Sequence, residues 1–346
     1  MDVRLSPEQE TLRDSAAQIV DKLGPKAVGQ LDDAERKARL DAAVDESGWR
    51  ELRGPSEGGV PLASGVEPAI IAEELGRGLA DVSFLGPTLA AELRRLAGAP
   101  PVSSDETVGL DAKLGSPVHA DDLASSSMVA IDAHGCATAL FLVPDAHGYR
   151  LAQVDLGPAR SGLDLTRPSA VLPSPSAPAL VEDSHRLITA DNLRRWTALA
   201  LTLTSADLTG VMDGAVHLAC EYAKARTQYG AAIGSFQAVQ HMLADAFTLT
   251  EGARSITRHA AWGVDALPGP EALAAAAAAK AYSARAARTV CETVMQVHGG
   301  VGNTWECLAH VFLRRALLSS EVCGDASVNL GRVLQHHGIG GGDGFR

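Results

Sequence analysis

The segment from Lys224 to Gln240 (KARTQYGAAIGSFQAVQ) carries side chains that suit a flat, phosphorylated ligand. Arg226 can hold a phosphate through two parallel N–H groups. Tyr229 and Phe236 can cover an aromatic ring, and Gln237 can hydrogen-bond to one. By itself, this segment predicts a corner of the molecule that accommodates an anion and a ring.

A second candidate is the glycine-rich run at 299–302 (GGVG), which follows a stretch with helical periodicity. A dinucleotide-binding fingerprint needs a strand before its glycines and a helix after them. The pattern therefore favours a tight turn between two helices. Backbone amides at the start of the next helix could still hold a phosphate or a ribose.

Weaker signals come from Asp207 and from the pair His336–His337. Asp207 lies in a mostly apolar stretch beside Ser205 and Ala206, which is more typical of a buried or interface carboxylate than of a catalyst. The two histidines lack partners at metal-ligand spacing, so we expect a solvated helix end and no metal site. No serine lies in a GxSxG pattern, and a hydrolase nucleophile is not supported.

Hydrophobic periodicity divides the chain into three parts that must position these groups. The first is helical and opens with a capping box at Ser6 (SPEQ), followed by helices over about 67–79 and after Pro87. Short apolar runs then predict strands at 128–131, 139–143 and 170–172. After Asp191 the pattern predicts a long helix, a second one from Phe236, an Ala-rich one over 271–297, and two shorter ones after Gly302 and Asp325.

The expected fold is mainly α with a small β domain. We expect an N-terminal helical domain (1–104), a reduced middle β domain (105–190), a C-terminal helical bundle (191–337) and a flexible glycine-rich tail (338–346). A length of 346 residues fits two or three domains or one composite domain.

Composition excludes several classes of function. The formal net charge of −12 argues against a nucleic-acid partner. The longest stretch of low charge, 196–206, is too short to span a membrane. Five dispersed cysteines and a charged N-terminus without an apolar leader favour reduced thiols and a cytoplasmic location.

Three motifs, RTQYG (226–230), IGSFQAVQ (233–240) and QVHGGVG (296–302), resemble those of the acyl-CoA dehydrogenase family in type, order and separation. The run IAEELGR (71–77) looks like part of that family's N-terminal helical domain. An actinobacterial branch of the family has similar sequence around TWE (304–306) and the RR pair (314–315).

The resemblance implies an α–β–α subunit with a C-terminal four-helix bundle, FAD, and dehydrogenation of an acyl-CoA between its α and β carbons. In the family, flavin binding is shared across a dimer interface. Arg226 would grip the FAD pyrophosphate of the neighbouring chain, and the 296–300 segment would contact its adenosine. The implied FAD contacts are Arg226, Gln228, Tyr229, Ile233, Phe236, Gln237, Gln296, Val297, Gly299 and Gly300.

The family's catalytic glutamate has no counterpart at either of its usual positions. Aligning the RRA run (314–316) with the family's RDA-like motif places Cys323 at one of these positions. Counting back from Arg226 places Ala200 at the other. A thiol with an ordinary pKa of about 8.5 is a poor substitute for a carboxylate. Asp207 and Glu321 are the nearest alternative bases.

The middle β domain departs from the family as well. It lacks the TEPxxGSD-like and Trp-Ile-Thr-Asn-like stretches that normally hold the isoalloxazine ring and the substrate thioester, and it is short. The motifs that serve a neighbour's FAD are therefore present, whereas those that serve the chain's own flavin are degraded.

This segregation predicts a base-lacking subunit of a heteromeric acyl-CoA dehydrogenase. Its partner would be a full-length paralogous subunit in an α2β2 assembly. Its substrate would be an acyl-CoA such as the steroid side-chain CoA esters of some actinobacterial enzymes, and its electron acceptor would be an electron-transfer flavoprotein. Two alternatives stay open here. One is a self-sufficient homo-oligomeric enzyme with Asp207 or Glu321 as the base, and the other is an FAD-free scaffold or CoA-ligand binding protein.

Overall fold

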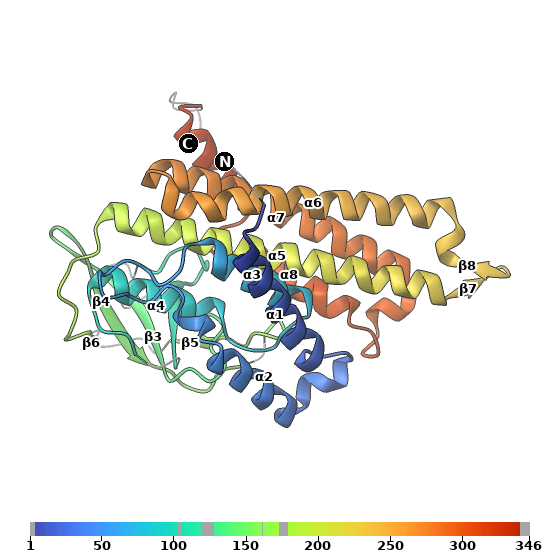
Figure 1. Cartoon of the computed structure of the whole chain (residues 1–346), viewed down its shortest axis with the longest axis horizontal. Coiled ribbons are helices and arrows are strands. Elements are labelled where there is room, and N and C mark those ends of the chain that lie inside the picture. Colours follow the sequence, from blue (N-terminus) through green and yellow to red (C-terminus); the bar gives the residue numbers. More distant parts are fainter. Residues whose placement is uncertain (1–3, 103–104, 119–127, 161, 173–178, 340–346) are drawn as a thin grey trace.

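The computed structural model describes residues 4–102, 105–118, 128–160, 162–172 and 179–339. Over these residues the chain is mainly helical with a small six-stranded sheet, as expected, and a separate two-stranded hairpin (Figure 1). The predicted tail lies outside the described residues from position 340 onward. No helix within the described ranges is both long and apolar enough to cross a membrane.

The N-terminal third is helical and begins with the predicted capping box. Ser6 Oγ accepts from the backbone N of Gln9 at 3.3 Å, while Gln9 Oε1 accepts from the backbone N of Ser6 at 3.0 Å. The helices of this part are α1 (Pro7–Leu23), η1 (Val28–Asp32), α2 (Ala34–Glu46), η2 (Trp49–Glu51), α3 (Val66–Arg77) and α4 (Leu85–Ala97).

The middle part forms a six-stranded sheet of order β5-β2-β1-β3-β4-β6, in which only β1 and β3 pair in parallel within the described ranges. The strands are β1 (Glu106–Asp111), β2 (Met128–Ala130), β3 (Thr138–Asp145), β4 (Gly148–Asp155), β5 (Ala170–Val171) and β6 (Ala179–Leu180). The three predicted runs correspond to β2, β3 and β5. The strands β1, β4 and β6 were missed because polar residues interrupt β1 and β4, and β6 is two residues long.

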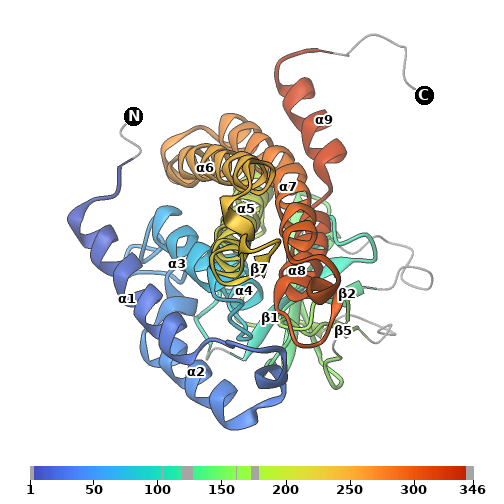
Figure 2. The same ribbon diagram turned by 90° about the vertical axis from the view of Figure 1, so that its right-hand side faces the viewer.

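The C-terminal part contains three long helices that run back and forth, with shorter helices beside them (Figures 1 and 2). The expected long helix, the helix after Phe236 and the Ala-rich helix are all present. The elements are α5 (Ala190–Ala225), β7 (Thr227–Gln228), β8 (Ala231–Ala232), η3 (Ile233–Ser235), α6 (Gln237–Ala266), α7 (Gly269–His298), η4 (Gly299–Asn303), α8 (Ala309–Glu321) and α9 (Ala326–His336).

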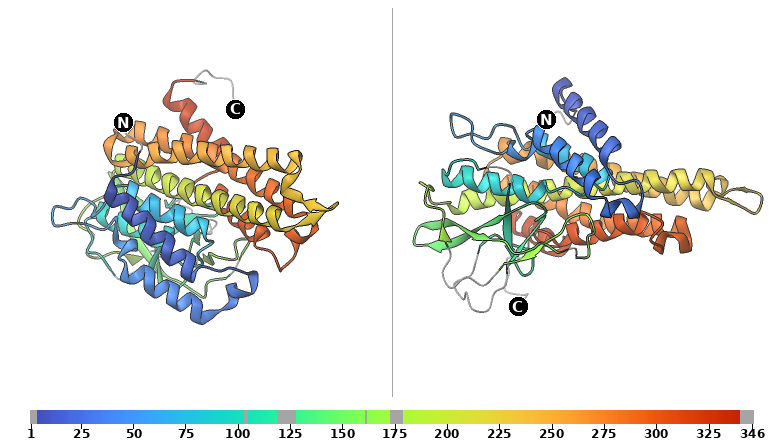
Figure 3. Two further views of the ribbon diagram at one scale, coloured as in Figure 1. Left: turned by 45° about the vertical axis from the view of Figure 1, so that its right-hand side comes forward. Right: turned by 90° about the horizontal axis from the view of Figure 1, so that it is seen from below.

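Helix α5 lies at the centre of the structure and contacts α3, α6, α7 and α8. The six-stranded sheet lies beside the N-terminal half of α5 (Figure 3). Glycines let α3 and α5 touch through their backbones. A Cβ added to Gly210 on α5 would lie 1.8 Å from the carbonyl oxygen of Glu73, and one added to Gly76 on α3 would lie 2.4 Å from that of Asp207. This close contact fixes the N-terminal part against the bundle.

Replacing Gly210 with Ala is expected to destabilise the fold by about 2–3 kcal/mol, because backbone atoms cannot move aside for the new methyl group. The matched control is Gly331→Ala on α9, where nothing lies within 4 Å of the added Cβ. That change should stabilise the protein by about 0.5–1 kcal/mol through helix propensity. Chemical denaturation measures both, and equal effects of the two changes would contradict the backbone contact.

Candidate functional site

A short hairpin projects from the end of the bundle where α5 turns into α6 (Figure 1). Its two strands, β7 and β8, are joined by Tyr229 and Gly230, whose φ angles of 52° and 80° belong to a tight hairpin turn. A positive φ is uncommon for a tyrosine. The turn holds the Tyr229 side chain away from the body of the protein, with 97% of its surface exposed.

Arg226 caps the C-terminus of α5 and exposes its side chain at the base of this hairpin. Its backbone is fixed, since its N donates to the Tyr222 carbonyl and its carbonyl accepts from the Ile233 N, both at 2.8 Å. Within the part of the chain that the structure describes, no carboxylate pairs with its guanidinium. Arg226 is thus a positioned cation that faces solvent.

The aromatic and amide groups of the motif lie beside this cation. Phe236 is 38% exposed and packs edge-on against Tyr229, with 6.5 Å between the ring centroids. Gln237 is exposed at the first residue of α6, and Gln228 is exposed on β7. Ile233 is half-buried against the core, so it supports the hairpin more than it forms its surface.

The second motif reaches the same end of the bundle, because α7 runs back toward the hairpin and ends at His298 (Figure 1). The rings of His298 and Tyr222 stack at 4.4 Å and join the ends of α7 and α5. Gln296, Gly299 and Gly300 are exposed, and η4 forms the predicted turn between helices.

Val297 differs from the other predicted FAD contacts in its burial. Val297 is only 8% exposed and belongs to the hydrophobic core, because it lies on the inner face of α7. Its side chain is not offered to a ligand. His336 and His337 are exposed at the end of α9, as expected of a solvated helix end.

Both positions to which the resemblance assigns the family's catalytic base are closed to solvent. Ala200 on α5 and Cys323 after α8 have no exposed surface. The backbone N of Cys323 donates to the Leu114 carbonyl at 2.7 Å, so a loop of the β region covers it. Burial raises the pKa of the Cys323 thiol to about 11, which keeps it protonated at neutral pH. Glu321, two residues earlier, is exposed to solvent.

A buried lysine, which the sequence interpretation missed, closes the turn that carries Cys323. Lys280 on α7 has no exposed surface, and its Nζ donates to the carbonyls of Ser319, at 2.8 Å, and Val322. An ammonium group at the C-terminus of α8 satisfies carbonyls that the helix leaves unpaired. Burial lowers the pKa of Lys280 to about 8. The available signal was a lone lysine within an Ala-rich run of α7.

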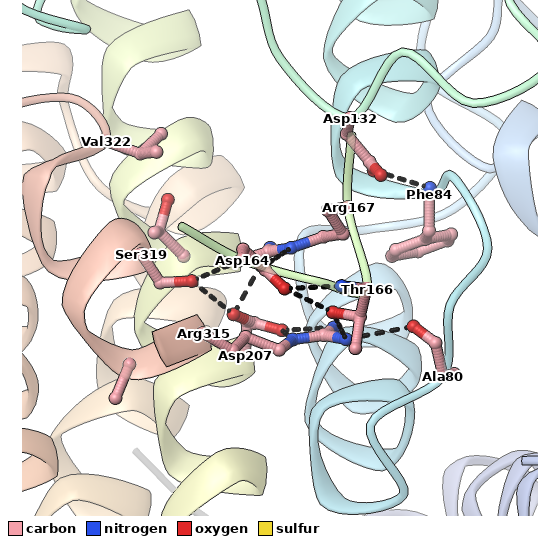
Figure 4. A network of polar contacts seen from close by, with 12 residues as sticks. Ala80, Phe84, Asp132, Asp164, Thr166, Arg167, Asp207, Arg315, Ser319 and Val322 are labelled. Atoms are coloured by element: carbon pink, nitrogen blue, oxygen red, sulfur yellow. Dashed lines mark hydrogen bonds and ion pairs between the residues drawn. The ribbon is translucent and has the colours of Figure 1, made fainter. Parts of the chain in front are cut away.

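Asp207 is a buried ion-pairing carboxylate, the interpretation that its neighbours in the sequence favoured. Its Oδ1 accepts from Arg315 at 2.6 and 3.0 Å, and its Oδ2 accepts from Ser319 Oγ at 2.7 Å (Figure 4). Arg167 lies 3.3 Å from Oδ2. Burial raises the pKa of Asp207, but the two arginines and the hydrogen bonds from Arg315 and Ser319 outweigh burial and lower it.

The same cluster joins the three parts of the chain. Arg315 on α8 also donates to the Ala80 carbonyl of the α3–α4 loop at 2.9 Å and to Thr166 Oγ1 at 3.1 Å. Arg167 donates to Asp164 at 2.9 Å, from a loop of the β region. The cavity beside these groups measures about 10 Å³, room for at most one water molecule. The space beside this cluster is therefore filled almost entirely by the chain itself.

Replacing Asp207 with Asn is expected to destabilise the fold by about 3–5 kcal/mol, because two buried arginines lose their shared counter-ion. The matched control is Glu292→Gln, which removes an exposed pair with Arg288 and should cost below about 0.5 kcal/mol. Since folding lowers the pKa of Asp207, its contribution is complete above the unfolded pKa of about 3.9 and is lost as the pH falls through the folded pKa. Denaturation of both variants across pH measures this, and a small, pH-independent effect of Asp207→Asn would contradict the ion pairs.

Comparisons with known proteins agree with this architecture. The family model "Acyl-CoA dehydrogenase, C-terminal domain" matches residues 201–337. The acyl-CoA dehydrogenase IpdE2 of Mycobacterium tuberculosis is 31% identical over 91% of this chain and 92% of its own, and IpdE2 of Mycolicibacterium smegmatis is 28% identical over 95% and 98%.

Two solved structures share the fold at 22% identity each. They are a Tcur3481–Tcur3483 steroid ACAD variant, with a TM-score of 0.78 over 96% of this chain and 98% of that one, and the ChsE4–ChsE5 complex from Mycobacterium tuberculosis, with a TM-score of 0.75 over 98% and 99%. The family model, the near-complete match to IpdE2 and the common fold lead to one conclusion: this chain belongs to the acyl-CoA dehydrogenase family.

Proposed function

We propose that this chain is a subunit of a heteromeric, FAD-dependent acyl-CoA dehydrogenase that completes the FAD site of a catalytic partner and supplies no base. The observation that carries the proposal is a contrast between two regions of one bundle. The cofactor motifs are exposed at its end, whereas the positions of the base are buried in its interior.

The exposed end has the chemistry that FAD requires. Arg226 offers a pyrophosphate a guanidinium that pairs with no carboxylate among the described residues. Tyr229 and Phe236 offer faces for a flat ring. Gln296 and the exposed glycines of η4 offer amide groups suited to an adenosine. These groups point outward, so they suit a cofactor that a second subunit holds. When bound, FAD accepts the hydride removed from the substrate, and the role of this chain is to bind and orient it.

The interior argues against a self-sufficient enzyme. Ala200 carries no titratable group, and the Cys323 thiol is buried and protonated. The Asp207 carboxylate is paired with Arg315 and Arg167. It cannot accept a substrate proton without breaking the cluster that joins the parts of the chain. The about 10 Å³ cavity beside it leaves no space for an acyl chain.

The solved structures support a partner of a particular kind. Each is named for two different components, Tcur3481–Tcur3483 and ChsE4–ChsE5, and the first is a steroid ACAD. For the present chain we propose a full-length paralogous subunit in an α2β2 assembly, with the CoA ester of a steroid side chain as substrate and an electron-transfer flavoprotein as acceptor. Its five unpaired cysteines suit the cytoplasm.

Arg226→Ala is expected to lower FAD retention in the purified assembly at least about tenfold, because a charge-assisted pyrophosphate contact contributes about 1.5–3 kcal/mol. The matched control is Arg194→Ala, which removes an exposed arginine from the first turns of α5, at the opposite end of the helix. It should leave the FAD content unchanged. Flavin absorbance of assemblies co-expressed with the paralogous subunit measures both, and equal FAD content would refute the shared site.

Glu321→Gln in this chain is expected to leave acyl-CoA turnover by the assembly unchanged, because the base belongs to the partner. Glu321 is exposed, so the change should not affect folding. Steady-state turnover measures this. Loss of turnover with FAD still bound would favour a self-sufficient enzyme with Glu321 as the base.

A further inference from the structure

A mostly apolar pocket lies between α4, the loop that follows η2, and the segment that leads into β1. Its volume is about 110 Å³, compared with about 10 Å³ for the cavity beside Asp207. One wall is a face of α4 whose residues lie three or four positions apart, namely Pro87, Ala90, Ala91 and Arg94. The two alanines on this face leave space that larger side chains would fill, so the sequence of α4 creates the pocket.

The two arginines that line the pocket already have carboxylate partners. Arg94 is 6% exposed, and its Nε and Nη2 both donate to Glu106, the latter at 2.6 Å. Arg50 is 5% exposed, and its Nη1 and Nη2 donate to Asp45 and Asp41. A charged ligand would lose its hydration without finding an unbalanced charge on these arginines. The pocket therefore favours a neutral ligand.

The same hydrogen bonds determine which part of each guanidinium a ligand can use. The N–H groups of a guanidinium lie in its plane. The third nitrogen of Arg94, Nη1, donates to the Pro100 carbonyl at 3.3 Å, and that of Arg50, Nε, donates to the Ser83 carbonyl at 2.8 Å. Because every nitrogen of both groups has a partner in the plane, a ligand gains most from contact with a flat face. An aromatic ring is the group that stacks on such a face.

Exposed apolar side chains lie where the pocket opens to solvent. Leu62 and Val102 line the pocket and are 58% and 45% exposed, and Glu51 beside them is exposed as well. Large apolar side chains that gather on a surface often belong to a binding site. An apolar cavity of about 150 Å³ is large enough to bind benzene. A pocket of about 110 Å³ therefore suits one six-membered ring and is too small for a fused ring system.

We propose that this pocket binds a small neutral molecule built on one aromatic ring, with the ring against the guanidinium groups of Arg94 and Arg50. The site is separate from the FAD motifs. The Leu89 carbonyl of α4 accepts from Trp196 Nε1 at 3.0 Å near the start of α5, whereas Arg226 follows the end of α5. At about 1.5 Å per residue, roughly 45 Å of helix separates the two places. Binding at this pocket therefore does not depend on the proposed function.

Ligand-observed NMR titrations of the full chain at about pH 7 test the proposal with phenol, cyclohexanol, benzoate and benzylammonium. We expect phenol to bind with a Kd of about 0.1–1 mM, within the limit that its few non-hydrogen atoms allow. Cyclohexanol should bind at least about threefold more weakly, because it cannot stack on a guanidinium. Benzoate and benzylammonium should bind at least about tenfold more weakly, because each carries a charge into a pocket whose arginines are already paired. Equal affinity of phenol and any of these three, or no binding of phenol at about 10 mM, would overturn the proposal.

A variant that fills the pocket locates the binding. Ala91→Leu places a larger side chain on the α4 wall and keeps a strong helix former, so the affinity for phenol should fall at least about tenfold. The matched control is Ala244→Leu, which makes the same change at an exposed position of α6 and should leave the affinity unchanged. Phenol binding that Ala91→Leu retains in full would place the ligand elsewhere and overturn the proposal. The four-probe titration of the wild-type chain decides the question even if Ala91→Leu does not fold.

Discussion

The buried cluster around Asp207 is the interaction on which the rest of the structure depends. One carboxylate on α5 is held by Arg315 from α8 and Arg167 from the β region, and Arg315 reaches on to the α3–α4 loop. A buried charge lowers the stability of the fold unless it is paired and hydrogen-bonded. Removing any member of the cluster therefore leaves a buried charge without its partner. The cluster therefore specifies one arrangement of the three parts of the chain.

That arrangement has a functional consequence. Ion pairs fill the region around Asp207 where the three parts meet. Hydrogen bonds from Lys280 hold the turn that carries Cys323, so these buried polar groups stabilise the fold. The long helices α5 and α7 extend from this region to the far end of the bundle, where Arg226 and η4 are exposed. A subunit that contacts a neighbour's cofactor needs that exposed end and has no need of an open interior.

Local patterns in the sequence predicted local structure well. The capping box at Ser6, the long helices and the turn at 299–302 depend on neighbouring residues and were confirmed. The strands β1 and β4 were missed because polar residues interrupt them. The partners of Asp207 and the burial of Lys280 were missed for a different reason. Arg315 lies 108 residues from Asp207, and no spacing rule connects positions that meet only through the tertiary fold.

The family motifs predict which residues meet FAD, and the structure shows that these residues differ in exposure. Arg226 and Tyr229 face solvent, while Val297 supports the core. The central claim, that this chain completes a site but does not hold one, is tested most directly by its flavin content when purified alone and with its paralogous partner. We predict no stoichiometric FAD and no acyl-CoA oxidation by the chain alone, and both in the assembly. Stoichiometric FAD with acyl-CoA oxidation by the isolated chain would contradict the account.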